Sequence, residues 1–156
     1  WRTNRFDNPM QFELGTPWKG FESPGSWVLT EVTEPDVIGG ELAILLVGGD
    51  LTVDELVGEL EATEGITFSE PTPASALGRD GVMLTAAPTT ENVAFGFLFD
   101  PTIEQPWVAI PDVQHEVFVL DEDGKAMVVW LDALPDGWEA FSAEATSVLD
   151  SIVEER

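Results

Sequence analysis

The chain has 156 residues, 44% of them hydrophobic, which is the length and composition of one folded domain with a substantial core. Six Lys and Arg stand against 30 Asp and Glu, so the formal net charge is -24. A surface this acidic repels phosphate backbones and anionic lipid headgroups, which disfavours nucleic-acid binding and membrane binding through basic patches. The longest apolar run, residues 42–47, has the length of a strand and not of a membrane span.

The composition also bears on the compartment. The sequence begins at Trp1 without a charged and then apolar signal segment, which indicates a chain that has been processed or trimmed. Acid-rich, Lys-poor chains occur in the salty cytoplasm of halophiles, where salt screens carboxylate repulsion, and among exported domains of high-GC bacteria. Six Trp and nine Phe favour export, and the absence of Cys fits both settings. We expect an extracellular or cell-envelope location, with a lipid anchor on a missing N-terminal segment as one option and the halophile cytoplasm as the alternative.

The chain shows no internal repeat and no low-complexity linker, so one compact unit is expected. Residues 1–9 are predicted to form an N-terminal arm, residues 10–153 a single α+β domain, and residues 154–156 a tail. Strands are predicted, in chain order, at residues 10–14, 26–33, 41–47, 66–70, 79–87, 92–99, 116–120 and 126–131.

Two of these strands have informative faces. Residues 41–47 are apolar on both faces, which is typical of a strand in the middle of a sheet covered on both sides. In residues 92–99 the large side chains alternate, and one face is predicted to carry Val93, Phe95, Phe97 and Phe99. The opposite face, with Ala94, Gly96 and Leu98, is small enough to let a helix approach closely.

Pro and Gly mark the predicted connections. Residues 15–25 are predicted to be a loop from which Trp18 and Phe21 pack down onto the core, and residues 100–111 a long connection carrying Trp107. Turns are predicted at residues 34–40, which include a Gly pair, and at the Gly pair of residues 48–49. The clearest hairpin turn is residues 121–125, in which Gly124 supplies a positive φ angle.

Two helices carry start signals. Thr52 and Glu55 have the spacing of a capping box, in which each side chain accepts a hydrogen bond from an orphan backbone N–H, and Gly65 is a plausible stop. Asp136 and Glu139 predict the same arrangement for the C-terminal helix. The apolar stripe of that helix has steps of three and four residues and consists of Trp138, Phe141, Ala145, Val148, Leu149 and Ile152.

Mostly antiparallel strands with two helices predict an α+β fold, in which a sheet of about six to eight strands is covered by helices. A resemblance to a known family rests on Phe6 ahead of a Trp27-containing strand, on residues 78–82 (Gly-Arg-Asp-Gly-Val), and on residues 141–152, Phe-x-x-Glu-Ala-x-x-Val-Leu-Asp-Ser-Ile. In layout the chain resembles the exported PsbP/Mog1-like α/β/α sandwich domains, of the actinobacterial Lpq-type lipoprotein kind. The resemblance implies a non-catalytic binding or assembly role, and no functional residue carries over one by one.

The sequence contains no recognisable catalytic apparatus. His115 is the single histidine and there is no Cys, so a zinc site is excluded and a His-based nucleophile system is disfavoured. His115 is predicted to be a strand-end residue half packed against the sheet, in phase with Val117. Asp132 and Asp136 flank a Pro135 turn, but Asp136 is already explained as a helix cap. We therefore predict that the protein is not an enzyme and assign no catalytic, cofactor-binding or metal-binding residue.

Calcium is the metal that an acidic chain most readily suggests. Residues 121–124, Asp-Glu-Asp-Gly, are superficially similar to an EF-hand loop, but the ligand spacing and the terminal Glu of such a loop are absent. The segment is predicted to be a hairpin turn. Weak, non-specific binding of divalent cations to the acidic surface is favoured over a dedicated site.

The aromatic residues of the predicted loops are the remaining functional hint. Trp18, Phe21 and Trp107 are expected either to cover the core or to form a binding surface. The first hypothesis is a non-catalytic exported accessory domain that docks on a partner protein of the cell envelope. Its acidic surface would favour a basic or metal-bridged partner. The alternatives are a carrier of a small apolar or amphiphilic ligand, with a cavity near Trp18 and Trp107, and a cytoplasmic halophile protein of unknown function.

Overall fold

The computed structural model describes residues 2–3, 10–14, 18–23, 25–34, 37–47, 49–89, 91–100 and 105–154. The predicted arm, residues 1–9, lies largely outside this part, as do Phe6 and Gly48. The helices are α1 (Val53–Glu61), η1 (Pro135–Gly137, a 3-10 turn) and α2 (Trp138–Ser151). The strands are β1 (Met10–Gln11), β2 (Trp18–Glu22), β3 (Ser26–Glu34), β4 (Val37–Leu46), β5 (Ile66–Phe68), β6 (Thr72–Ala76), β7 (Arg79–Pro88), β8 (Val93–Asp100), β9 (Gln105–Ala109), β10 (Gln114–Glu122), β11 (Lys125–Ala133) and β12 (Val153–Glu154).

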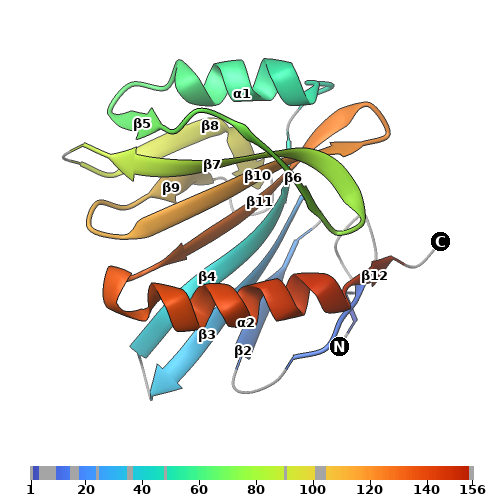
Figure 1. Cartoon of the computed structure of the whole chain (residues 1–156), viewed down its shortest axis with the longest axis vertical. Coiled ribbons are helices and arrows are strands. Elements are labelled where there is room, and N and C mark those ends of the chain that lie inside the picture. The colour runs from blue at the N-terminus through green and yellow to red at the C-terminus, as the bar shows by residue number, and fades with distance from the viewer. Residues whose placement is uncertain are drawn as a thin grey trace.

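Eight strands form one sheet, as the sequence predicted. Its order is β2-β3-β4-β11-β10-β7-β5, with β6 also paired to β7, and all of these pairs are antiparallel (Figure 1). The β8–β9 hairpin and the β1–β12 pair are separate small ladders. The predicted α+β class, with an antiparallel sheet and a C-terminal helix, is confirmed.

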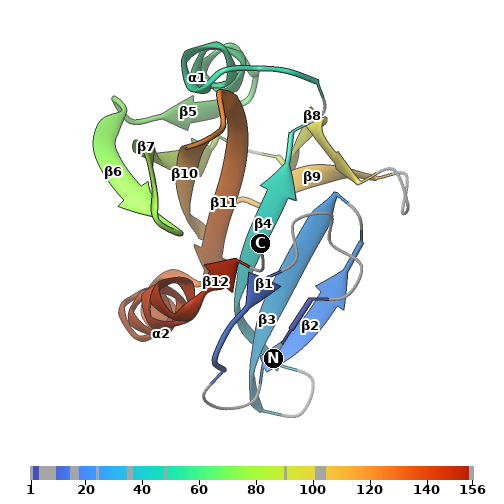
Figure 2. The same ribbon diagram turned by 90° about the vertical axis from the view of Figure 1, so that its right-hand side faces the viewer.

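The sheet is covered on both faces. One face packs against α2 and against residues 10 and 12, and the other packs against α1 and the β8–β9 hairpin. In Figure 2, α1 lies at the top and β8 and β9 lie to the right of the central strands β4 and β11, whereas α2 lies at the lower left. In the central strands β4 and β11 successive residues enter opposite cores, so Ile44 and Leu45 are both buried. The expectation that residues 41–47 form a strand covered on both sides is confirmed.

Two predicted connections contain strands, and a third is shorter than predicted. Residues 15–25 contain β2, residues 100–111 contain β9, and the predicted turn at residues 34–40 is shortened because β4 begins at Val37. β2 and β9 have strand geometry but weak strand sequences, because each lies at a ladder edge and contains Gly20 or Pro106. Gly40 lies inside β4, where a Cβ would overlap the ring of Phe141, so this glycine permits close packing of α2 and does not make a turn.

The face predicted for β8 is half right. Val93 and Phe95 are buried as expected, but the ladder register shifts between Phe95 and Phe99, and Leu98 is buried in place of a continued alternation. Gly96 is exposed, and a Cβ at that position would meet no atom within 4 Å. The expectation that a helix packs closely on that face is therefore wrong.

The helix starts differ in how they match prediction. The capping box of α1 is present: Thr52 Oγ1 accepts from the Glu55 N–H at 3.4 Å, and Glu55 Oε2 accepts from the Thr52 N–H at 2.9 Å. The predicted cap of α2 is wrong, because Gly137 is its N-cap and Asp136 lies in η1 after Pro135. Pro135 opens η1, and this extra 3-10 turn moves the start of α2 past Asp136. The predicted stripe is confirmed, with Phe141, Ala145, Val148 and Leu149 buried.

The β10–β11 hairpin fixes the register of the central strands. Its turn has two residues, Asp123 and Gly124, with φ angles of 52° and 86°, where five residues had been predicted. The Gly124 N–H donates to Asp121 Oδ1 at 2.7 Å, which stabilises the turn. The positive φ expected for Gly124 is confirmed.

Gly81 in β7 offers a sharp test of sheet packing. A Cβ there would overlap the Val119 carbonyl oxygen and lie 2.8 Å from the Leu120 Cα, and neither backbone atom can rotate away. Gly81→Ala should lower the free energy of unfolding by about 1–3 kcal/mol, measured by chemical denaturation. The control Gly58→Ala, on the exposed side of α1 with nothing within 4 Å, should raise it by up to about 1 kcal/mol. Equal effects of the two substitutions would contradict this account.

Candidate binding face

The three aromatic residues predicted to form a binding surface are not brought together. Trp18 is 6% exposed and packs against Phe141, with ring centroids 6.0 Å apart, on the α2 side of the sheet. Phe21 is three residues further along β2, so it points to the opposite side and is 52% exposed. Trp107 packs against Trp130 in the other core, with centroids 6.3 Å apart. Trp18 is therefore a core residue, and Phe21 and Trp107 lie on one side of the sheet.

Phe21 belongs to a corner of the sheet that the described elements leave uncovered. Lys19 and Phe21 of β2 lie opposite Thr30 and Val28 of β3, on the side that α1 and β8–β9 cover elsewhere. Lys19 is exposed, Val28 and Thr30 are half-buried, and β2 and β3 lie apart from α1 (Figure 2). We call Lys19, Phe21, Val28 and Thr30 the open face.

A row of polar residues runs from the covered sheet to the open face. In neighbouring strands, His115 of β10 lies opposite Asp132 of β11, Asp132 opposite Glu41 of β4, and Glu41 opposite Thr30 of β3. The Thr30 hydroxyl donates to Glu41 Oε1 at 3.3 Å. Next to this polar row lies an apolar one, in which Phe21, Val28, Ala43, Trp130 and Val117 follow one another across the same strands.

His115 is held as a neutral structural group. It is 1% exposed, its Nε2–H donates to the Ile110 carbonyl at 2.9 Å, and its Nδ1 accepts from the Trp130 indole N–H at 3.2 Å. An indole N–H can only donate, which fixes this tautomer. Burial lowers the pKa of His115, against the effect of the hydrogen bond to Ile110. The sequence predicted a half-packed residue; the structure buries it fully because β9 and the segment after it cover the end of β10.

Asp132 is the most perturbed carboxyl of the row. Burial, and then the charge of Glu41, raise the pKa of Asp132 to about 7. Its Oδ2 lies 3.9 Å from His115 Nδ1, which is beyond hydrogen-bond reach. Because His115 uses both nitrogens for buried hydrogen bonds, its imidazole is not available as a general base. The arrangement positions strands and the covering hairpin.

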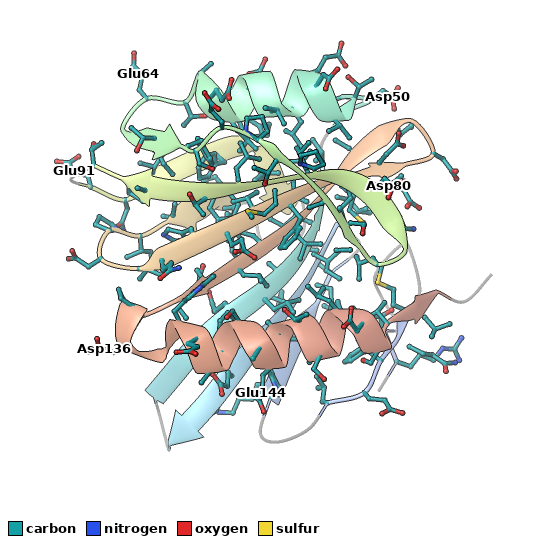
Figure 3. All side chains as sticks on the ribbon, in the orientation of Figure 1. Asp50, Glu64, Asp80, Glu91, Asp136 and Glu144 are labelled. Atoms are coloured by element: carbon teal, nitrogen blue, oxygen red, sulfur yellow. The ribbon has the colours of Figure 1, made fainter. Side chains whose placement is uncertain are left out.

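The acidic charge is spread over the whole molecule. The labelled carboxylates in Figure 3 come from both ends of α1, from β7 and the turn after it, from η1 and from α2: Asp50, Glu64, Asp80, Glu91, Asp136 and Glu144. On the α2 side, burial and the neighbouring Glu144 carboxyl raise the pKa of Glu31. Two of the few basic residues are engaged in ion pairs, Arg79 with Glu122 and Lys125 with Asp50. The labelled carboxylates therefore come from several elements, and Lys19 is a basic residue of the open face.

Hollows formed by described residues lie at the turns. One of about 840 Å³ opens between the β6–β7 turn, the β10–β11 turn and residues 152–153, beside the Arg79–Glu122 pair. Another, of about 350 Å³, adjoins Lys125. Neither is lined by Trp18 or Trp107. Within the described ranges there is no group of three or more His, Asp or Glu placed to hold a metal ion, and no helix long and apolar enough to cross a membrane.

Comparison with known proteins adds information on the fold. No family model matches the chain, and no curated protein is similar to it. A crystal structure from Bacteroides thetaiotaomicron is 14% identical with a TM-score of 0.51 and covers 94% of this chain, which spans 45% of that protein's length. LpqN of Mycobacterium tuberculosis, a protein involved in cell envelope biogenesis, is 18% identical over 94% of this chain and 83% of its own, with a TM-score of 0.45. Cyanobacterial PsbP from Synechocystis is 15% identical over 94% of this chain and 92% of its own, also with a TM-score of 0.45.

At sequence identities this low, a structural similarity bears on the fold and not on activity or partners. LpqN and PsbP are of the two kinds named by the sequence resemblance, but their TM-scores are 0.45, so membership of the PsbP/Mog1-like family stays a prediction. Export, lipid anchoring and an actinobacterial origin stay predictions.

The open face itself was missed in the sequence. Lys19 carried no signal because residues 15–25 were interpreted as a loop, and Thr30 lay in the predicted strand at residues 26–33 without being assigned to a surface. The signal that could have revealed it is the alternation of Trp18 with Lys19 and of Gly20 with Phe21, which places an apolar ring on each face of a short strand.

The raised pKa of Asp132 predicts the direction in which the stability of the fold changes with pH. The folded chain binds a proton at Asp132 more tightly than the unfolded chain does, so protonation of Asp132 stabilises the fold. This contribution to the free energy of unfolding is complete below about pH 4 and is lost as the pH rises through about 7. Asp132→Asn mimics the protonated form. Its gain in melting temperature over the parent should grow from pH 5 to pH 8 by about 2–4 °C or more, measured by circular dichroism. Asp136→Asn, an exposed change in η1, should show no such growth; a pH-independent gain for Asp132→Asn would refute the assignment.

Proposed function

We propose that this protein is a non-catalytic binding domain that docks on a partner protein through the open face. The observation that carries the proposal is the contrast along β2, where Trp18 is 6% exposed and Phe21 is 52% exposed. A large exposed aromatic ring on the β2–β3 strand pair, next to half-buried Val28 and flanked by Lys19 and Thr30, has the character of an interface centre with a polar rim.

The charge selects the kind of partner. With a formal net charge of -24, the chain attracts basic proteins over long range and repels acidic ones. Encounter with a basic partner is therefore fast and sensitive to salt. Weakly bound divalent cations on the same surface would reduce the repulsion of a less basic partner.

The ligand-carrier alternative has less support. It requires an apolar cavity near both Trp18 and Trp107, but these rings lie on opposite sides of the sheet and each packs against a core ring, Phe141 or Trp130. A cavity shared by the two would have to pass through the central strands. The packing of the described residues thus favours docking over enclosure.

The docking proposal predicts a specific mutational contrast. Phe21→Ser should reduce the yield of the partner cross-linked from the solubilised source envelope by about tenfold, because interface aromatics commonly contribute more than 1 kcal/mol. The yield is measured by quantitative mass spectrometry against the parent protein. Val153→Ser is the matched control, since Val153 is 64% exposed on β12, which lies on the α2 side of the sheet. Equal loss in both variants, or in neither, would count against the open face.

We further propose that the domain works outside the cytoplasm, in the cell envelope. The alternative, a halophile cytoplasm, makes the opposite prediction about salt. An envelope domain should be fully folded at an ionic strength of about 0.15 M, where the Debye length is about 8 Å, and should gain stability modestly as salt screens the carboxylates. Far-UV circular dichroism during dialysis from high to low salt measures this. Unfolding as the salt concentration falls below about 1 M would favour the halophile.

A further inference from the structure

β2 ends the large sheet on one side. It pairs with β3 along one edge, and within the described ranges no strand pairs with its other edge. An exposed strand edge presents unpaired N–H and C=O groups and is a template for the addition of another strand.

The hydrogen-bond pattern identifies which peptide groups face outward. The Ser23 N–H donates to the Ser26 carbonyl at 2.8 Å, so these two residues form a hydrogen-bonded pair at the closed end of β2 and β3. Because such pairs alternate along an antiparallel ladder, Phe21 bonds to Val28, and Gly20 directs its N–H and C=O away from β3. The Leu46 N–H donates to the Gly25 carbonyl at 2.9 Å, which gives β3 the matching phase toward β4.

The opposite edge of the sheet is protected in a way that β2 is not. There β7 carries β5, which has three residues, and β6, in which Pro73 lacks an N–H. Short strands and proline are the usual means of blocking strand addition. β2 has five residues and contains no proline, and Gly20 at its middle is exposed. The two edges therefore differ in their capacity to accept a strand.

We propose that β2 accepts an extended, basic segment of a partner protein as an additional strand, with Gly20 at the centre of the new ladder. This inference rests on the proposed docking function and specifies its mode. The added segment would place alternate side chains beside Phe21 on the open face. A basic segment is selected by the net charge of -24, which outweighs the single local positive charge of Lys19 on β2.

Amide exchange tests the proposal without any mutation. The probe is a capped peptide of alternating Lys and Val. It is about six residues long, so that at roughly 3.3 Å per residue it spans the length of the five-residue strand β2. In the free protein the Gly20 N–H should exchange rapidly and the Phe21 N–H slowly, measured by ¹⁵N NMR. Peptide addition should slow exchange at Gly20 by about tenfold or more, and a peptide of alternating Glu and Val should not.

Two substitutions at Gly20 distinguish the effect of losing its backbone N–H from the effect of adding side-chain atoms. Gly20→Pro removes the outward N–H without removing a bond to β3, and should weaken peptide binding by about tenfold. Gly20→Ala keeps the N–H and meets the same neighbour, Leu29 Cδ2 at 3.3 Å from the added Cβ, so it should bind like the parent. Isothermal titration gives both dissociation constants, and circular dichroism verifies that each variant is folded.

The outcomes separate this inference from the proposed function. Loss of binding in Gly20→Pro together with Gly20 protection in the parent supports strand addition. Binding that Phe21→Ser abolishes while Gly20 stays unprotected overturns strand addition and leaves docking on the open face. If the basic peptide does not bind, strand addition of this kind is wrong, and the envelope cross-linking result decides on docking independently. If Gly20→Pro does not fold, the exchange rate of the Gly20 N–H in the parent protein decides between the two outcomes.

Discussion

The β4–β11 pair separates two hydrophobic cores, so these strands are buried on both faces. The arrangement of the other elements follows from this. In β11 Trp130 enters one core and Leu131 the other, each no more than 1% exposed. Burying both sides of the same strands requires a cover on each face, which α2 supplies on one side and α1 with β8–β9 on the other. Among the described residues neither cover reaches the corner formed by β2 and β3 on the hairpin side, and this corner is the open face.

The polar row connects the covered part of the sheet, at His115, to the open face, at Thr30. His115 ties the segment after β9 to the sheet through the Ile110 carbonyl and holds Trp130 through its indole. Asp132 and Glu41, both half-buried, continue the row toward half-buried Thr30. Polar groups at this depth are tolerated because each of them meets a hydrogen-bond partner or retains partial contact with water.

How much the sequence could predict depended on how strongly each element is buried. Residues 41–47 and the helix stripe from Trp138 onward have patterns set by burial alone, so the fold class and α2 were predicted correctly. β2 and β9 are ladder edges in which Gly20 and Pro106 break the pattern, and both were interpreted as loops. The cap at Asp136 failed because Pro135 starts a 3-10 turn, a local choice that capping rules do not include. Of the predicted surface, Phe21 is exposed, whereas Trp18 became core, because the face a side chain takes follows from strand register.

The contact between Trp130 and His115 makes the chain its own optical probe. The two rings lie 5.8 Å apart in an edge-to-face arrangement, away from bulk water. A cationic imidazole beside an indole quenches its emission, whereas a neutral one does so weakly. Among the six tryptophans of the chain, the contribution of Trp130 to the fluorescence therefore depends on whether His115 is charged, and with it on whether the hairpin still covers that end of the sheet.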